Sequence, residues 1–318
     1  MRKNENMERI AEVARLYYEE GKSQAEIGKL LGVSHSTISR MLKEAREQKI
    51  VEVFIRQPIK LLSDFSEQLE NRFLLEKAYV VNSSGYDDGE SLNQIGLQAA
   101  HILADVLHDG ARLGISTGRT VAATIQQFNI SQPMHVQVVP LHGQKEERSE
   151  PGGNLLHRLA EHLGKDVVAL PAPWLMQSVE AHQLITQEKS VFEALQVAEN
   201  VGVGLVGIGS IHDDGSNILR NGWLSQDEVD ALQNAGAVGE ICGVFCDHDG
   251  QALDANFNQR VVSIRLEKLR DIETVVGVAG SKRKAEAIYA ALRGGLIKIL
   301  VTDSEAAKEI LKLADNGH

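Results

Sequence analysis

Residues 23–42 read SQAEIGKLLGVSHSTISRML, and this stretch decides the fold of the first part of the chain. Ser23 stands where a helix N-cap belongs, and Glu26 follows three residues later, which predicts a capping box at the start of a short helix. Gly32 closes this helix, because glycine adopts the positive φ of a tight turn without steric cost. Ser34 then caps a second helix. Two helices joined in this way predict a helix-turn-helix motif.

Apolar residues around this turn recur at helical spacing and predict a small helical core. A preceding helix is expected to end near Gly21, and we expect Val33 and Ile38 to pack against Ile27 and Leu30. The segment 50–55, IVEVFI, alternates like a β-strand and predicts a wing after the helices. The apolar set is Ile10, Val13, Ala14, Tyr17, Ile27, Leu30, Leu31, Ile38, Met41, Leu42 and Ala45.

In a helix-turn-helix the second helix of the motif enters the major groove of double-stranded DNA. Arg40 is placed to contact a guanine or a phosphate, and short hydroxyl side chains suit phosphates or bases. A helical bundle that contacts only protein is the alternative, but the capping, glycine and polar positions all favour operator DNA. The predicted DNA-binding residues are Ser34, His35, Ser36, Thr37, Ser39, Arg40 and Lys43.

Charge is distributed unevenly along the 318 residues, whose formal net charge is -11. Residues 1–60 contain twelve Lys and Arg against nine Asp and Glu, a net charge of +3, so the remainder has a net charge of -14. This asymmetry predicts a mildly basic DNA-binding head on an acidic body.

Several classes of protein are disfavoured by what the sequence lacks. Its first residues are polar and no apolar stretch follows, so we expect no signal peptide. No apolar run approaches the roughly 18 residues of a membrane span, so we expect no membrane partner and a cytoplasmic protein. The cysteines, Cys242 and Cys246, are too few for a disulfide framework and lack the spacing of a zinc site. We expect reduced thiols, no metal and no cofactor.

After residue 77 short apolar runs alternate with amphipathic stretches, which predicts an α/β fold with a doubly wound, mostly parallel sheet. The expected domains are a helix-turn-helix domain at 1–56, a connector at 57–76 and an effector-binding domain at 77–318. The connector contains a helix that either packs on the following domain or pairs subunits. Strands are expected at 78–81, 112–115, 136–141, 167–170, 203–208, 261–264, 274–278 and 299–301. Helices are expected at 90–107, 120–128, 153–163, 188–199, 225–235, 282–292 and 304–314.

Ligands of such sheets bind beyond the carboxyl ends of the strands. Residues 114–121, GISTGRTV, follow a strand and open a helix, where backbone N–H groups and Arg119 suit an anion. The loop lacks the spacing and the lysine of a nucleotide-hydrolysing P-loop, and an ordinary turn is the alternative.

Two further stretches at strand ends contain charged residues that suit a ligand. Residues 281–284, SKRK, open another helix, and because cations there oppose the helix dipole, one or more of Lys282, Arg283 and Lys284 is a candidate anion ligand. Asp247 precedes a turn at Asp249-Gly250 and is either a hydroxyl acceptor or a solvated carboxylate.

At this point the chain resembles the SorC family of sugar-responsive bacterial transcription regulators. The matching pieces are residues 23–51 and the motifs LGISTGRT, VVPLHG, GLVGIGS, AVGEICGVFCDHDG, VVGVAGSKRKAEAIYAALRGG and ILVTDSEAAKEIL, in this order. The effector domain of that family is similar to sugar-phosphate isomerases and to the glucosamine-phosphate deaminase fold. The resemblance implies a sugar, polyol or sugar phosphate as effector and a homodimer or homotetramer. Its phosphate would be held by Ser116, Thr117, Gly118, Arg119, Thr120 and Lys284, with Asp247 at the sugar hydroxyls and Asn154 as a further contact.

The chain departs from the family pattern at two places, because the family commonly has Trp in place of Thr117 and a glycine pair in place of Gly143-Gln144. The resemblance to the family therefore does not identify the effector of this chain. The expected function is DNA-binding regulation of a carbohydrate or polyol catabolic operon, controlled by the effector. The alternative is an isomerase- or deaminase-like enzyme with a DNA-binding head. An isomerase needs a positioned general base, and although Asp247, His142 and His248 are candidates, no constellation of catalytic residues supports a reaction.

Overall fold

The computed structural model describes residues 2–48, 50–51, 59–130, 134–144, 155–164, 166–211 and 222–316. Contacts within the chain divide it into two compact units, Met1–Pro58 and Ile59–His318. Each unit is described by itself.

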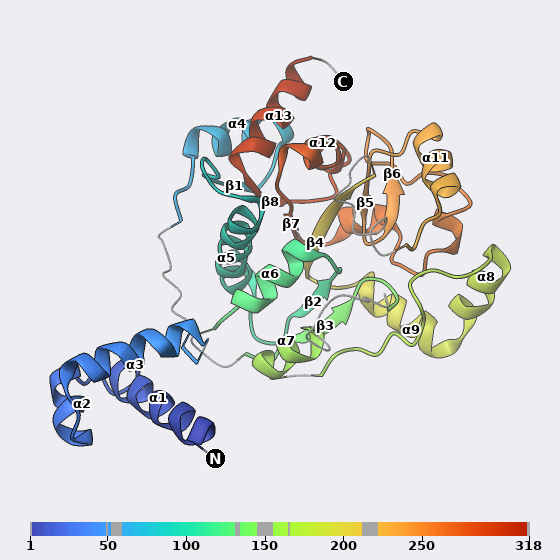
Figure 1. Cartoon of the computed structure of the whole chain (residues 1–318). Helices are drawn as coiled ribbons and strands as arrows, with labels where there is room; N and C mark the ends of the chain where they lie inside the picture. The colour runs from blue at the N-terminus through green and yellow to red at the C-terminus, as the bar shows by residue number, and fades with distance from the viewer. Residues whose placement is uncertain are drawn as a thin grey trace. The chain divides into compact units, whose positions relative to one another are not determined.

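The first unit contains α1 (Arg2–Tyr18), α2 (Gln24–Leu31) and α3 (His35–Glu47) (Figure 1). The predicted capping box of α2 is present, since the Ser23 N–H donates to the Glu26 carboxylate at 2.8 Å and the Glu26 N–H donates to the Ser23 hydroxyl. Hydrogen bonds from the Ser23 side chain and backbone hold the pKa of Glu26 below its usual range. Gly32, with φ 65°, ends α2, and Ser34 accepts the Thr37 N–H at the start of α3.

Residues from all three helices form the core of the first unit. Leu30 was expected in this core, and that expectation is wrong, because its side chain is 61 % exposed. Over the two turns of α2 only one stripe faces inward, and Ile27 and Leu31 occupy it. The predicted wing at 50–55 lies mostly outside the described residues; Ile50 and Val51 pack against the core. The buried set is Ile10, Val13, Ala14, Leu16, Ile27, Ile38, Met41, Leu42 and Ala45.

The second unit is built on a sheet that has eight strands among the described residues, six of them in the order β1-β8-β7-β4-β2-β3. All neighbours along this path are parallel, whereas β5 and β6 add an antiparallel extension at the end of β4. The predicted α/β fold with a mostly parallel sheet is confirmed. The strands are β1 (Lys77–Val81), β2 (Arg112–Ile115), β3 (Gln137–Pro140), β4 (Val203–Ser210), β5 (Gly239–Ile241), β6 (Val244–Cys246), β7 (Thr274–Val278) and β8 (Ile299–Asp303).

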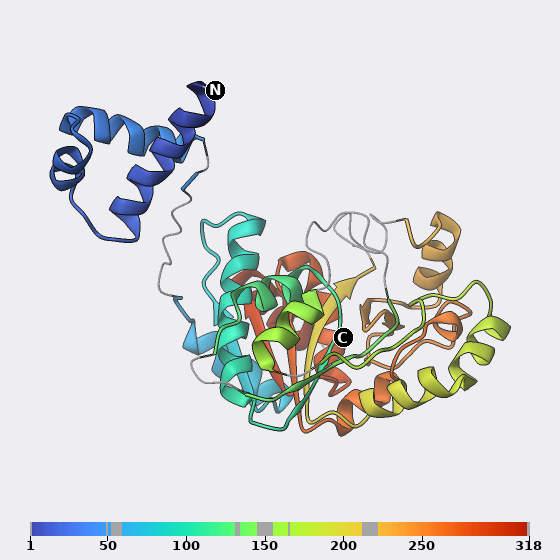
Figure 2. The same cartoon turned by 90° about the horizontal axis from the view of Figure 1, so that it is seen from below.

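Helices cover both faces of this sheet (Figures 1 and 2). One face packs against α5 (Asp88–Val106), α6 (Arg119–Gln127) and α7 (Leu155–Leu163), and the other against α4 (Ser63–Phe73), α12 (Ala285–Arg293) and α13 (Ser304–Asp315). Strand alternation explains the two cores: Ile299 and Val301 of β8 belong to the first, and Leu300 belongs to the second. The remaining elements are α8 (Val179–Gln187), α9 (Lys189–Ala198), α11 (Gln226–Asn234), and the 3₁₀ turns η1 (Asn258–Arg260), η2 (Leu266–Asp271) and η3 (Lys282–Lys284).

Two predicted strands are wrong. Residues 167–170 and 261–264 form only isolated bridges, from Val167 to Val138, from Val261 to Leu175 and from Ser263 to His142. Their apolar side chains are instead parts of loops that pack against the cores. The strands β5 and β6 and the helix α8 were not predicted. None of the helices in the described ranges is long and apolar enough to cross a membrane.

Candidate functional site

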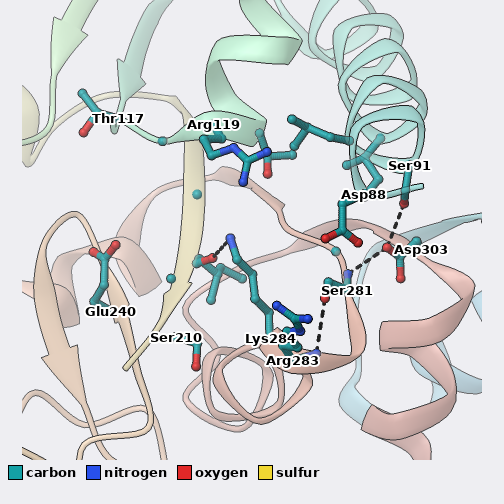
Figure 3. Close-up of a pocket in the computed structure, with 18 residues that line it drawn as sticks. Asp88, Ser91, Thr117, Arg119, Ser210, Glu240, Ser281, Arg283, Lys284 and Asp303 are labelled. Atoms are coloured by element: carbon teal, nitrogen blue, oxygen red, sulfur yellow. Dashed lines mark hydrogen bonds between the residues drawn. The ribbon is translucent and has the colours of Figure 1, made fainter. Parts of the chain in front are cut away.

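A pocket of about 130 Å³ opens at the carboxyl ends of the parallel strands (Figure 3). The carboxyl ends of β4 and β8 and the segments that follow β2 and β7 meet there, together with the first two turns of α5 and a residue of β5. The lining residues are Asp88, Ser91, Leu92, Ile95, Thr117, Gly118, Arg119, Thr120, Gly207, Ile208, Gly209, Ser210, Glu240, Gly280, Ser281, Arg283, Lys284 and Asp303.

The amino terminus of α6 opens into this pocket without a side-chain cap. Its N-cap is Gly118, with φ 149° and ψ 158°, which has no side chain to accept a hydrogen bond from the first turn. The first N–H groups of a helix have no partner within the helix, and the helix dipole makes that end favourable for an anion. By contrast, α5 is capped by Asp87 through a capping box with Glu90 and has acidic residues in its first turn. Of these two helix termini, α6 is therefore the one suited to an anion.

His142 fixes the loop that precedes α6. Its imidazole is buried, with Nδ1 2.7 Å from the carbonyl oxygen of Gly143, and its Nε2 accepts the Thr117 N–H at 3.0 Å. The Thr117 hydroxyl lies 3.1 Å from the same Nε2 atom. Ser116, also buried, accepts the Gly207 N–H with its hydroxyl at 2.9 Å. This hydroxyl joins the loop to β4, and Ser116 is not among the pocket-lining residues.

Three cationic side chains line the pocket: Arg119 from α6, and Arg283 and Lys284 from η3. The Lys284 ammonium donates to the carbonyl oxygen of Ile208 at 3.0 Å, which holds its side chain across the end of β4 (Figure 3). Ser281, at the preceding turn, has a positive φ of 86°. This conformation is uncommon for a residue other than glycine. It lies in the turn that connects the carboxyl end of β7 to η3.

Carboxylates occupy other parts of the lining. Glu240 of β5 accepts the Gly243 N–H at 2.7 Å, and Asp88 lies in the first turn of α5. Asp303, 3 % exposed, caps α13 by accepting the Ala306 N–H at 2.8 Å. Carboxylates accept hydrogen bonds and do not donate them when ionised, so Glu240 and Asp88 suit hydroxyl groups of a ligand.

The structure brings five of the predicted effector-binding residues together in this lining: Thr117, Gly118, Arg119, Thr120 and Lys284. Ser116 lies beneath the loop. Asp247 is not part of the lining, and its carboxylate accepts the N–H groups of Asp249 and Gln251, each at 2.9 Å, within the turn after β6. Asn154 lies outside the described residues.

Sequence reasoning missed six polar residues of the lining: Asp88, Ser91, Ser210, Glu240, Ser281 and Asp303. Two of them had a signal in the sequence, since Asp303 follows a buried strand and precedes a helix, and Ser281 sits at another such junction. Glu240 had none, because its strand was not predicted.

In the first unit, the predicted DNA-binding residues lie in the first turns of α3 or at its cap. All of them are exposed except Thr37, which is half-buried. The hydroxyls of Ser36 and Thr37 lie 2.9 and 2.8 Å from the Ser34 hydroxyl. Arg40 and Lys43 are exposed on the next turns of α3.

Comparison with known families covers both units. A family model described as "Putative sugar-binding domain" matches residues 57–312, and a helix-turn-helix domain model matches residues 8–45. The chain belongs to the SorC family of sugar-binding transcription regulators.

Relatives match along nearly the whole length. The chain is 32 % identical to "Transcriptional regulator LsrR" of Enterobacter sp. (strain 638), over 96 % of this chain and 94 % of that protein. It is 31 % identical to "Sorbitol operon regulator" of Klebsiella pneumoniae, over 98 % of this chain and 100 % of that protein. The crystal structure of the full-length sorbitol operon regulator SorC from Klebsiella pneumoniae has a TM-score of 0.72 at 30 % identity, and the match covers 96 % of this chain and 99 % of that chain.

The chain is therefore a DNA-binding transcription regulator with a sugar-binding effector domain. Cys242 and Cys246 are both buried, and neither forms a disulfide. Burial raises the pKa of the Cys246 thiol to about 12, so at neutral pH it is protonated and a poor nucleophile or metal ligand.

Proposed function

We propose that the pocket binds a phosphorylated sugar or polyol, and that its occupancy controls the affinity of α3 for an operator of a carbohydrate or polyol operon. The observation that carries this proposal is the uncapped amino terminus of α6 in a pocket that also contains Arg119 and Lys284. The phosphate would accept hydrogen bonds from the first N–H groups of α6 and from the two cations.

The remaining lining supports a polyhydroxylated body for this ligand. Glu240 and Asp88 would accept hydrogen bonds from its hydroxyls, and Ser210 and Ser281 offer further polar contacts. Asp247 and Asn154 remain predictions for this role, although the Asp247 carboxylate already accepts two backbone N–H groups.

For the DNA side, we propose that Ser34, His35, Ser36, Thr37, Ser39, Arg40 and Lys43 meet the operator. Helix-turn-helix proteins read two half-sites with two copies of the motif, which supports a homodimer or homotetramer. We propose that this oligomer acts in the cytoplasm. The working division of labour is DNA binding at 1–56, a connector at 57–76 and effector binding at 77–318.

A thermal-shift panel tests the ligand class. It compares sorbitol 6-phosphate, glucose 6-phosphate and ribose 5-phosphate with unphosphorylated sorbitol. A ligand at about a hundred times its Kd stabilises the native state by about 2.7 kcal/mol. For a domain of this size that raises the melting temperature by roughly 5–10 °C. We expect at least one phosphorylated compound to produce such a shift and free sorbitol to produce a smaller one.

Arg119→Ala and Lys284→Ala should each remove most of this shift, because each deletes a charge facing the phosphate. Lys282→Ala is the matched control: Lys282 belongs to the same basic stretch but pairs with Glu309 at 3.6 Å and is not part of the lining. If the two pocket variants respond like the wild type, the ligand binds elsewhere and the proposed site is wrong.

A further inference from the structure

A cluster of buried polar residues lies at the carboxyl ends of β1 and β8. It comprises Ser83, Ser91, Asp303 and Ser304, which are 8 %, 8 %, 3 % and 1 % exposed. Buried polar groups are costly unless they are hydrogen-bonded, and apolar residues would fill such a position at lower cost. Ser91 and Asp303 line the pocket, whereas Ser83 and Ser304 do not, so ligand contact does not account for the latter two.

Hydrogen bonds join these residues into one chain. A single carboxylate oxygen of Asp303 accepts both the Ser91 hydroxyl, at 2.9 Å, and the Ser281 N–H, at 2.8 Å (Figure 3). The next residue, Ser304, accepts the Ser83 N–H with its hydroxyl at 3.2 Å, and the two serine hydroxyls lie 2.9 Å apart. The pocket lining is thus connected through Asp303 and Ser304 to the loop that follows β1.

That loop also holds the segment 59–62, through which the chain from the first unit enters the second. The Asn82 N–H donates to the carbonyl oxygen of Lys60 at 2.8 Å, and the Leu62 N–H donates to that of Val80 at 2.9 Å. Leu61 forms an antiparallel bridge with Val81. The segment therefore pairs through one isolated antiparallel bridge with the free edge of β1, which is the terminal strand of the parallel path.

The direction of this paired segment determines where the chain enters the second unit. Because it runs antiparallel to β1, its first residues lie beside the carboxyl end of β1. The carboxyl ends of the parallel strands also form the pocket. The connection from the DNA-binding unit and the effector pocket thus meet the sheet at the same end.

We propose that Ser83 and Ser304, called here the serine pair, transmit the occupancy of the pocket to the docked segment 59–62. This inference rests on the proposed function, because it requires a ligand in the pocket. A ligand that hydrogen-bonds to Ser91 or Ser281 competes with Asp303 for these donors and shifts the start of α13, where Ser304 holds Ser83. Ser83 is adjacent to Asn82, whose N–H holds Lys60. Two ligand states of the pocket therefore become two docking states of the segment.

Hydrogen–deuterium exchange on the full chain tests this, with saturating inorganic phosphate as the probe. In the wild type, phosphate should slow exchange at residues 117–121 and change it severalfold at 59–62 and 80–83. Ser304→Ala removes both hydrogen bonds of the serine pair, and Ser83→Ala removes only the one between hydroxyls. Both variants should speed exchange at 59–62 without phosphate, Ser304→Ala the more, and both should lose the phosphate-dependent change there.

Two readouts separate transmission from simple loss of structure. Both variants should keep the phosphate protection of residues 117–121, because neither serine lines the pocket. The double variant should resemble Ser304→Ala rather than the sum of the single variants, as expected for residues acting through one link. Ser263→Ala is the control, since it removes a half-buried hydroxyl that donates to the Leu141 carbonyl oxygen at 3.2 Å, away from residues 59–62 in the sheet, and it should behave like the wild type.

The inference is overturned if both variants exchange at 59–62 like the wild type. It is equally overturned if phosphate protects 117–121 while the phosphate-dependent change at 59–62 persists in Ser304→Ala. Failure of phosphate to protect 117–121 in the wild type would instead count against the proposed site, and the phosphate-free comparison of the variants would still decide whether the serine pair holds the segment.

Discussion

At the scale of single residues, His142 shows how a buried side chain outside the pocket lining can fix the conformation of a loop that contributes to the pocket. Its Nδ1 atom lies 2.7 Å from the Gly143 carbonyl oxygen, which accepts but does not donate, so Nδ1 must carry a proton. Nε2 must in turn be unprotonated, because it accepts the Thr117 N–H. The geometry therefore specifies the neutral Nδ1–H tautomer, and Thr117 is held in place by it.

If His142 fixes the loop as this tautomer, two substitutions of His142 should differ in their effect on sugar-phosphate affinity. His142→Leu leaves the Thr117 N–H without its acceptor, which costs roughly 1–3 kcal/mol, and we expect sugar-phosphate affinity to fall by about tenfold as the loop loses its geometry. His142→Gln places an amide oxygen near the former Nε2 position and should retain most of the affinity. Isothermal titration calorimetry measures both. Equal losses in the two variants would show that the acceptor is not what matters.

At the scale of elements, α3 has the features of a recognition helix: a serine cap, exposed polar residues in its first turns and Arg40 on the same face. A bidentate arginine–guanine contact contributes about 1–3 kcal/mol of base discrimination. We therefore expect Arg40→Ala to weaken operator binding at least about tenfold, with an unchanged circular dichroism spectrum.

Fluorescence anisotropy with the operator and with a scrambled duplex measures this loss. Arg9→Ala serves as the control, because Arg9 is exposed on α1 and its removal changes the net charge equally. Should the two variants lose affinity equally, Arg40 contributes only charge and the assignment of α3 to the groove fails.

The elements also show how far the sequence alone could lead. Helix-turn-helix caps are local, so Ser23, Glu26 and Gly32 were sufficient to predict α2 and its turn. The parallel strands β1, β2, β4, β7 and β8 are continuous apolar runs and were predicted within a few residues. By contrast, β5 and β6 are three residues each and enclose a tight turn at Cys242-Gly243, and no periodicity is readable over so few positions.

The site was predictable to the same degree. The loops at the starts of α6 and α12 were singled out because glycine, hydroxyl and basic residues at a strand–helix junction suit an anion, and residues of both loops line the pocket. Its carboxylates were not predictable, since Asp88 and Glu240 reach the pocket only through the tertiary fold. The absence of Asp247 from the lining has a related cause: its carboxylate accepts backbone N–H groups of its own turn, and local hydrogen bonds of this kind are common for aspartate.

At the scale of the whole molecule, the charge distribution limits what one DNA-binding unit can do. With a net charge of +3 over residues 1–60, a single copy makes few phosphate contacts, and salt-dependent affinity scales with their number. High affinity then requires two or more copies on one operator. We expect a duplex with a single half-site to bind at least about 100-fold more weakly than the full palindrome, which is the lower range of the gain from bivalency.

The salt dependence provides an independent measurement of the same property. The slope of log K against log salt should be about twice as steep for the full palindrome as for the half-site, because twice as many counterions are released. Equal affinities and equal slopes would indicate that one copy suffices for binding.

The antiparallel docking of residues 59–62 on the edge of β1 has a consequence for protein engineering. A fusion made just before Ile59 would keep the bridge between Leu61 and Val81 and the hydrogen bonds of residues 59–62, so backbone pairing defines the splice point. A foreign output module joined at this point would be connected to the second unit through the same backbone pairing with β1.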